Sequence, residues 1–323
     1  MKNIRFKSTC AAAAVACCAA VPLAQAQSSV TIYGRLNETV ERQKVGGATT
    51  TALQNNSSRI GFKGNEDLGG GLTAGFQIES GFSPDTGTAA STFWGRQSEV
   101  NLGGGFGLVR LGNFTSEAYY ATADYVSMHN HDTGTSSDAL YAYVSSNTNK
   151  LAYRSPSLGG ATVELARTLA EGAVGAVPTY DLAANYANGP LQLGAGYAKS
   201  GDSNQFAARA LYEFGAFVVG GYVQRDENNF GTLATGPATG KRTNVRLSAM
   251  YAMNSSEFHL NVGSAGKYSA VPDSKASQFT LGYNHKLSKR TKVYGFYTKL
   301  NDSAAALYGS DFSSLAVGIR HNF

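Results

Sequence analysis

The sequence predicts an all-β fold: a transmembrane, antiparallel, 16-stranded outer-membrane β-barrel with an inward-folded third long loop. Three observations predict it: strand-like alternation along most of the chain, a regular order of long and short connections, and an aromatic last residue. In the segment 315–323, Leu315, Val317 and Ile319 share one face, and the alternation runs to Phe323. Such a strand must pair with the first one, because an open sheet edge cannot be tolerated in lipid.

Alternating polar and apolar residues mark the expected strands. Their number is even, which is typical of a closed bacterial barrel whose two ends lie on the same side of the membrane. The predicted strands are 30–41, 58–65, 72–80, 93–102, 106–113, 148–154, 161–168, 179–187, 190–199, 204–213, 216–225, 241–251, 256–265, 275–285, 291–300 and 313–323.

The connections between these strands alternate in length. The short ones are rich in turn residues, such as those at 103–105 and 188–190. The long ones are polar and span 42–57, 81–92, 114–147, 226–240, 266–274 and 301–312, whereas 200–203 is short for its side. Long loops on one side and tight turns on the other are typical of an outer-membrane barrel rather than a soluble sandwich.

The N-terminal segment has the pattern of a secretory signal. Lys2, Arg5 and Lys7 precede an apolar stretch over 9–23, which ends in the small-residue site 24–26. We expect Sec-dependent cleavage after Ala26, which leaves 27–323 as a single barrel domain. A membrane anchor is disfavoured by the short apolar core, and a lipoprotein signal is disfavoured because no convincing lipobox precedes either cysteine at 17 or 18.

Cleavage changes what the composition implies. All three cysteines, Cys10, Cys17 and Cys18, would be removed, so neither a disulfide nor a cysteine-bound metal is expected. The formal net charge would fall from +5 to +2, and we therefore expect no nucleic-acid partner. A mean hydropathy of −0.20 agrees with a barrel, in which only alternate residues face lipid.

Strand parity assigns the two faces of the wall. In the first strand Val30, Ile32 and Leu36 would face outward, whereas Arg35 and Asn37 would face inward. A charged interior requires water, because a barrel of this strand number is too wide for side chains to fill. The predicted basic residues of the pore wall are Arg35, Arg59, Lys63, Arg110, Lys150 and Arg154.

The longest connection, 114–147, should narrow the pore. It contains no Lys or Arg, and its acidic residues are Glu117, Asp124, Asp132 and Asp138. Folded inward, these acids would face the bases of the wall and create a transverse field. The alternative is a solvated surface loop, but the length of the segment and its Tyr and Ala content favour inward packing. An excess of wall bases would give a mild preference for anions.

Other chemistry is weaker in this sequence. The run 69–74 fits a dinucleotide-binding pattern, but a strand rather than a helix follows it, so we interpret it as a turn. His129, His131 and Asp132 are interpreted as polar loop residues, with divalent-ion binding by the acidic loop left open. We expect no metal centre, no cofactor and no enzyme activity, because no nucleophile–base pairing is apparent for a barrel hydrolase. A plugged structural barrel would need a plug segment, and none is evident.

Several segments resemble one known family, the general porins of β-proteobacteria, including those of the Neisseria, Bordetella and Burkholderia type. The most specific match is the run SRIGFKGNEDLGGGL at 58–72, and further matches lie at 28–34, 155–160, 287–291 and 318–323. The resemblance implies a homotrimer in the bacterial outer membrane, each barrel having its own pore narrowed by the third long loop. It also implies passive diffusion of ions and small hydrophilic solutes, with a substrate-biased channel as the alternative.

The resemblance further assigns roles to residues. Arg35, Lys63 and Arg110 would correspond to constriction bases, although Asn113 stands where the family often has Arg. We expect Phe323 to act as the C-terminal assembly signal for the barrel-assembly machinery, and lipopolysaccharide to surround the barrel. Trimer contacts are expected from outward apolar residues of the first and last strands, including Tyr33.

Overall fold

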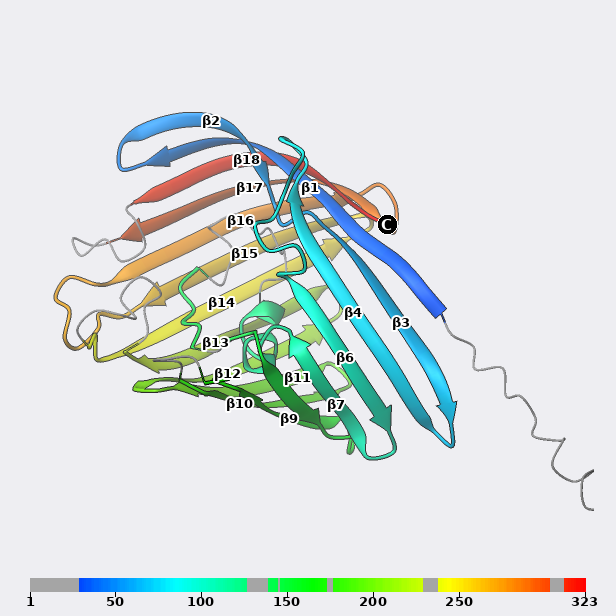
Figure 1. The fold of residues 1–323 in the computed structure, drawn as a ribbon. Helices are drawn as coiled ribbons and strands as arrows, with labels where there is room; N and C mark the ends of the chain where they lie inside the picture. Colours follow the sequence, from blue (N-terminus) through cyan, green and yellow to red (C-terminus); the bar gives the residue numbers. More distant parts are fainter. Residues whose placement is uncertain (1–28, 127–138, 145, 173–176, 229–237, 303–310) are drawn as a thin grey trace, which may run out of the picture.

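The structure is a computed structural model, and it describes residues 29–126, 139–144, 146–172, 177–228, 238–302 and 311–323. Its strands form one antiparallel sheet closed into a barrel (Figure 1). Because β2 and β3 pair in succession with β1, and β5 pairs only with the end of β4, the 18 strands make the predicted 16-stranded wall. Among the described residues, no helix is long and apolar enough to cross a membrane.

The elements follow in this order: β1 (Ser29–Val45), β2 (Ala48–Asn55), β3 (Arg59–Gly69), β4 (Leu72–Ser83), β5 (Thr88–Ala89), β6 (Gln97–Gly104), β7 (Gly107–Asn113), α1 (Glu117–Tyr120), η1 (Asp124–Val126), β8 (Lys150–Arg154), β9 (Ala161–Thr168), β10 (Thr179–Asn188), β11 (Leu191–Ser200), β12 (Ser203–Phe214), β13 (Phe217–Glu227), β14 (Lys241–Met253), β15 (Ser256–Ala265), β16 (Ala276–Lys286), β17 (Thr291–Asp302) and β18 (Phe312–Asn322).

The barrel is closed by pairing of the first and last strands. The register of β1 and β18 runs from Arg35 opposite Asn322 to Val45 opposite Phe312. At the C-terminus, which Figure 1 marks, the Gly34 amide donates to the Phe323 carbonyl at 3.1 Å and the Phe323 amide donates to the Gly34 carbonyl at 3.2 Å. The pairing expected from the alternating C-terminal segment is confirmed, and the seam leaves no open edge in the wall.

The prediction of a long loop over 42–57 is wrong. β1 continues to Val45, turns at Gly46 and Gly47, which have φ values of 53° and 99°, and returns as β2. The chain then bends at the fully buried Asn56 before β3 begins. The backbone amide of Asn56 donates to the backbone carbonyl of Asn37 at 2.8 Å. Most residues of β2 are exposed or only partly buried, so this hairpin lacks the amphipathic alternation that reveals a strand.

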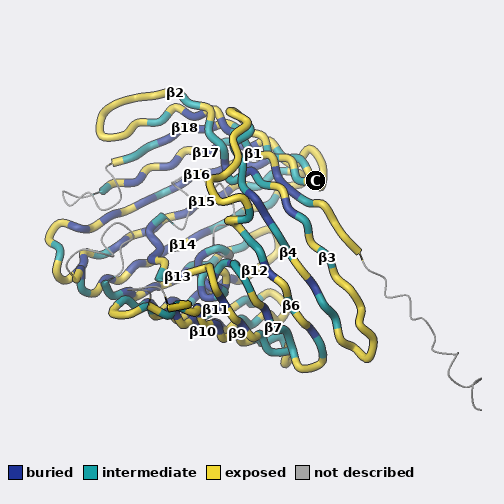
Figure 2. Tube along the Cα trace, viewed as in Figure 1, coloured by how far each residue is buried: buried dark blue, intermediate teal, exposed yellow. Residues whose placement is uncertain are grey.

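The wall has apolar residues outside and polar residues inside, the reverse of a soluble protein. Figure 2 shows how buried and exposed residues alternate along the wall strands. In β1, Val30 and Ile32 are 66% and 59% exposed, whereas Arg35 and Asn37 are 4% and 0% exposed. The parity predicted for the first strand is therefore confirmed. Exposed apolar side chains outside and shielded polar ones inside suit a barrel that meets lipid on its outer face.

Aromatic side chains form a continuous outward row near the short turns of β12 to β16. Neighbouring rings in this row have centroids 4.7–6.4 Å apart. A belt of aromatic residues is typical of the boundary between the apolar band of a barrel and water. The row comprises Tyr212, Phe214, Phe217, Tyr251, Phe258 and Tyr283.

Candidate pore constriction

The connection between β7 and β8 begins with a short helix that packs against the inner face of the wall. Ser116 caps α1 by accepting a hydrogen bond from the Ala118 amide at 3.2 Å. Ala118 is fully buried against Gly196 of β11, where a Cβ atom would lie 2.6 Å from the Ala118 carbonyl oxygen. Gly194, on the same face of β11, leaves room in the same way for the Ala121 carbonyl. The close approach of α1 therefore requires glycine on the wall.

Farther along the connection, side chains of the wall hold its backbone. The Gln224 side-chain amide donates to the Ala142 carbonyl at 2.9 Å and accepts from the Ala142 amide at 2.8 Å. Asn244 Nδ2 donates to the Leu140 carbonyl at 2.9 Å, and Ser248 Oγ donates to the Val126 carbonyl at 2.9 Å. The described parts of 114–147 thus lie against the inner, polar face of the barrel.

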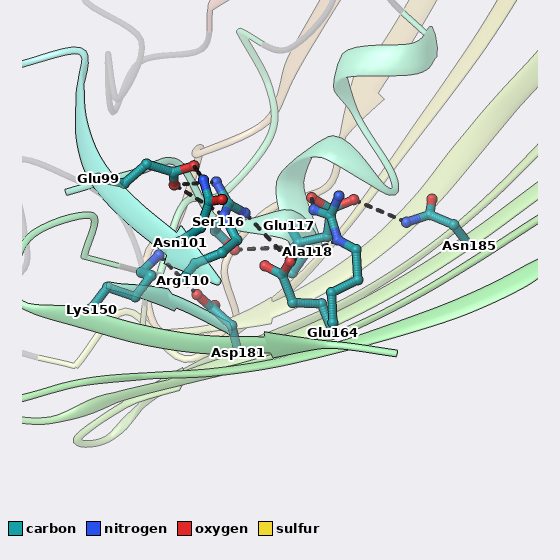
Figure 3. A network of polar contacts seen from close by, with 11 residues as sticks. Glu99, Asn101, Arg110, Ser116, Glu117, Ala118, Lys150, Glu164, Asp181 and Asn185 are labelled. Atoms are coloured by element: carbon teal, nitrogen blue, oxygen red, sulfur yellow. Dashed lines mark hydrogen bonds and ion pairs between the residues drawn. The ribbon is translucent and has the colours of Figure 1, made fainter. Parts of the chain in front are cut away.

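Ion pairs join the wall below this segment (Figure 3). Arg110 lies between two carboxylates, with Nη2 2.6 Å from Glu99 and Nη1 3.4 Å from Glu164. Lys150 Nζ lies 3.2 Å from Asp181. All five residues are buried, and each charge is compensated by a partner of opposite sign.

Glu117 links the helix to this network. Its carboxylate lies 2.5 Å from Arg154 Nη2 and accepts from Asn185 Nδ2 at 3.1 Å. Arg154 also lies 2.9 Å from Glu164 on β9. Burial raises the pKa of the Glu117 carboxyl, and the nearby Arg154 opposes that shift. An acid of the loop therefore meets a base of the wall. The sequence predicts such contacts between the two sets of residues but names no pair.

Elsewhere the predicted separation of charge, acids on the loop and bases on the wall, needs correction. Carboxylates of the wall itself, Glu99, Glu164 and Asp181, neutralise much of the basic set. The same occurs at Glu79 of β4, which lies 3.6 Å from Arg59. These acids share inward parity with the bases and sit on nearby strands, and cross-strand pairing then brings opposite charges together. Parity alone reveals the acids but not their partners.

The remaining predicted site residues lie in different places. Arg35 is buried on β1, and Lys63 on β3 is exposed, with Nζ 5.4 Å from the centre of the Tyr33 ring. Tyr33 has the parity of Arg35 and accepts a hydrogen bond from the inward Gln77 at 2.7 Å, so the expectation that Tyr33 makes an outward trimer contact is wrong. Asp124 lies in η1. Asp132 and Asp138, together with the two histidines at 129 and 131, fall outside the described residues. Among the residues that are described, no group of three or more His, Cys, Asp or Glu is placed to hold a metal ion.

Two bases on the far wall were not among the predicted pore residues. Arg246 of β14 is fully buried, and its Nη2 donates to Gln278 Oε1 at 2.6 Å. Arg242, on the same strand, lies 3.0 Å from Asp226. The inward parity used for the first strands would have identified both arginines had it been extended to β14.

Comparison with known proteins decides the family. A family model described as Gram-negative porin matches residues 11–305. This chain belongs to the Gram-negative porin family. It is 29% identical to outer membrane porin protein 32 of Delftia acidovorans, over 96% of this chain and 98% of that protein. It is 27% identical to an outer membrane porin protein of Bordetella pertussis, over 93% and 96% of the two chains.

Solved structures agree with this assignment. The chain is similar to an anion-selective porin from Comamonas acidovorans, with a TM-score of 0.76, 27% identity and coverage of 92% of this chain and 100% of that one. OmpF of Salmonella typhi shares the fold, with a TM-score of 0.75 at 18% identity over 91% and 97% of the two chains. The protein is thus an outer-membrane porin, a water-filled channel for passive diffusion of ions and small hydrophilic solutes.

Proposed function

We propose that this porin is a homotrimeric diffusion channel with a mild preference for anions, and that it has no enzyme activity. The preference for anions rests on inward basic residues whose partners are uncharged side chains, so that their positive charge is not neutralised. Lys63 lies over the Tyr33 ring, Arg246 contacts the Gln278 amide, and Lys292 Nζ is 5.7 Å from the centre of the Tyr294 ring.

The inward carboxylates are mostly compensated. Glu79, Glu99, Glu164 and Asp181 each lie within 3.6 Å of a basic side chain. Glu41 is an exception, held by neutral groups that include the Ser314 hydroxyl at 2.7 Å. Positive charge that is not neutralised raises the local concentration of anions in a narrow pore. The similarity to an anion-selective porin supports the same sign.

Zero-current potentials in a KCl gradient test this preference. We expect a potential of the anion-selective sign, and an Arg110→Ser variant should shift it toward cations, because the change leaves Glu99 without its basic partner. A Lys63→Gln variant should reduce the potential. A clear cation preference of the native protein would refute the proposal, and an inserted protein without conductance but with hydrolytic activity would favour a barrel enzyme.

Glu38 supports the trimer. This residue lies on the outward face of β1, opposite Ile319 of β18, between the exposed Leu36 and Val40. Both carboxylate oxygens are shielded and have no hydrogen-bond partner among the described residues. A lone carboxylate is costly in hydrocarbon, and such a residue is expected to face protein. The first and last strands therefore fit a subunit interface.

A Glu38→Leu variant tests whether this face of the barrel contacts lipid or a neighbouring subunit. If the Glu38 carboxylate, which its own barrel shields, turns to meet a donor of a neighbouring subunit, the change should lower the temperature at which trimers dissociate in unheated gels. If the face meets lipid, the change should stabilise the barrel instead. Migration of the native protein as a monomer would refute the trimer.

We also propose that the protein is exported and cleaved after Ala26. N-terminal sequencing of the membrane protein should then start at Gln27.

A further inference from the structure

A pocket beside α1 differs in chemistry from the charged wall around it. It encloses about 350 Å³ at the point where the inward segment leaves β7 and returns to β8. Three tyrosines, Tyr119, Tyr141 and Tyr143, form one side. Hydroxyl and amide side chains that include Ser116 and Gln205 form another. Every lining side chain among the described residues is uncharged, whereas the neighbouring network is built from ion pairs.

The tyrosine rings form a connected surface. The ring centroids of Tyr119 and Tyr143 are 4.7 Å apart, and those of Tyr141 and Tyr143 are 5.3 Å apart. Tyr141 is buried, and its hydroxyl lies 2.8 Å from Thr122 Oγ1, so its ring is fixed. Tyr143 is 48% exposed. A ring held from behind by its neighbours and open on one side can pack against a solute at little cost in conformational entropy.

The polar side of the pocket is also held in place. Gln205 is 2% exposed, and its Oε1 accepts a hydrogen bond from Gln224 at 2.6 Å. Ser116 is fixed by capping α1. Preorganised polar groups of this kind select a ligand by hydrogen bonding, without a cost for ordering the site.

We propose that the tyrosine pocket binds an uncharged, hydroxylated ring, such as a neutral monosaccharide, as it passes the constriction. The C–H face of a sugar ring can pack on the exposed Tyr143 ring, while its hydroxyls reach the amides and hydroxyls on the opposite side. Charged solutes gain nothing from a neutral lining. A volume of about 350 Å³ lies at the small end of ligand pockets and suits one ring rather than an oligosaccharide.

This binding rests on the open channel but not on the sign of its ion selectivity. The experiment is a titration of the purified trimer in planar bilayers with glucose and, separately, with sorbitol, an open-chain polyol with the same number of carbon atoms. Glucose should reduce the ion current in a saturable manner, beyond the reduction caused by sorbitol. Equal and non-saturating effects of the two solutes would overturn the proposal while leaving the porin function intact.

Two variants locate the effect. Tyr143→Ala should raise the half-blocking glucose concentration about tenfold, since it removes the stacking surface, and Tyr143→Phe should keep it within about twofold, since the ring remains. A Tyr143→Ala channel that glucose blocks as well as the native channel would overturn the site. So would block by benzyl alcohol without block by glucose, because the pocket would then be merely aromatic. If Tyr143→Ala fails to assemble, Asn147→Ala, which removes an exposed amide of the same lining, should weaken block, and unchanged block would count against the site.

Discussion

The barrel wall and the described parts of the segment 114–147, which lie against its inner face, are held in different ways. Each wall strand is hydrogen-bonded to two neighbours along most of its length, and the ladder closes on itself between β1 and β18. The described parts of the inward segment instead depend on a few contacts, such as Gln224 with Ala142 and Arg154 with Glu117. Substitutions in the wall away from this segment should therefore be widely tolerated, whereas the few wall residues that contact the segment should decide how the pore is narrowed.

The largest expected effect comes from the glycines of β11 that admit α1. In Gly196→Ala the new Cβ would lie 2.6 Å from the Ala118 carbonyl oxygen, closer than packed atoms allow. The helix must move into the lumen or the wall must distort, at a cost of about 1–3 kcal/mol. We expect an altered single-channel conductance together with easier thermal unfolding. Gly105→Ala is the matched control, because a Cβ at Gly105 meets nothing within 4 Å, and it should behave as the native protein.

A smaller effect is expected at Gln224, which tests whether side-chain bonds hold the segment. Gln224→Ala leaves the amide and carbonyl of Ala142 without their partner, and an unsatisfied buried group costs about 1–3 kcal/mol. Voltage-induced closures and open-channel noise should increase. Gln192→Ala removes an amide that contacts Glu213 at 3.2 Å near a short turn and should change neither. If Gln224→Ala channels show no more closures or noise than the native channel, the segment is held by other contacts.

The ion pair between the segment and the wall should have a smaller energy still. Arg154 is one-third exposed, so solvent screens its attraction to Glu117, and a coupling of about 1 kcal/mol or less is expected. A double-mutant cycle with Arg154→Gln and Glu117→Gln, measured by thermal unfolding, gives this value. The zero-current potentials should move in opposite directions, Glu117→Gln toward anions and Arg154→Gln toward cations. Parallel shifts would mean that the two groups do not act on the pore through their charge.

The same contrast explains what could be predicted from the sequence. Wall strands follow from local alternation, as in β1, where Val30, Ile32 and Arg35 reveal the two faces without knowledge of any neighbour. The hairpin of β1 and β2 escaped prediction because β2 has no consistently buried face. Strand ends are equally hard to place where pairing continues beyond the amphipathic part, since backbone bonds do not depend on side-chain type.

For the charged residues of the pore, the sequence predicted the inward position but not the ion-pair partners. Parity placed Lys150 inside, but its partner Asp181 lies two strands away, across β9, and this pairing depends on strand tilt and stagger. The role of Gly196 was invisible, because it depends on a helix that comes from a distant part of the chain. The alternation along a strand predicts which face of the wall a residue lies on. Its contacts with residues of other strands can be seen only in the closed barrel.

The smallest effect concerns pH and tests whether burial of Glu117 matters for selectivity. Because burial raises the pKa of this carboxyl, it takes up a proton at a higher pH than a solvated glutamate does. Protonation removes a negative charge beside Arg154, so anion preference should begin to rise as the pH falls toward the ordinary glutamate range, before solvated carboxylates titrate. Zero-current potentials of the native protein and Glu117→Gln, recorded across that range, should converge as the pH falls. A constant difference between the two would show that Glu117 keeps its charge, and that the attraction of Arg154 outweighs the desolvation of the carboxylate.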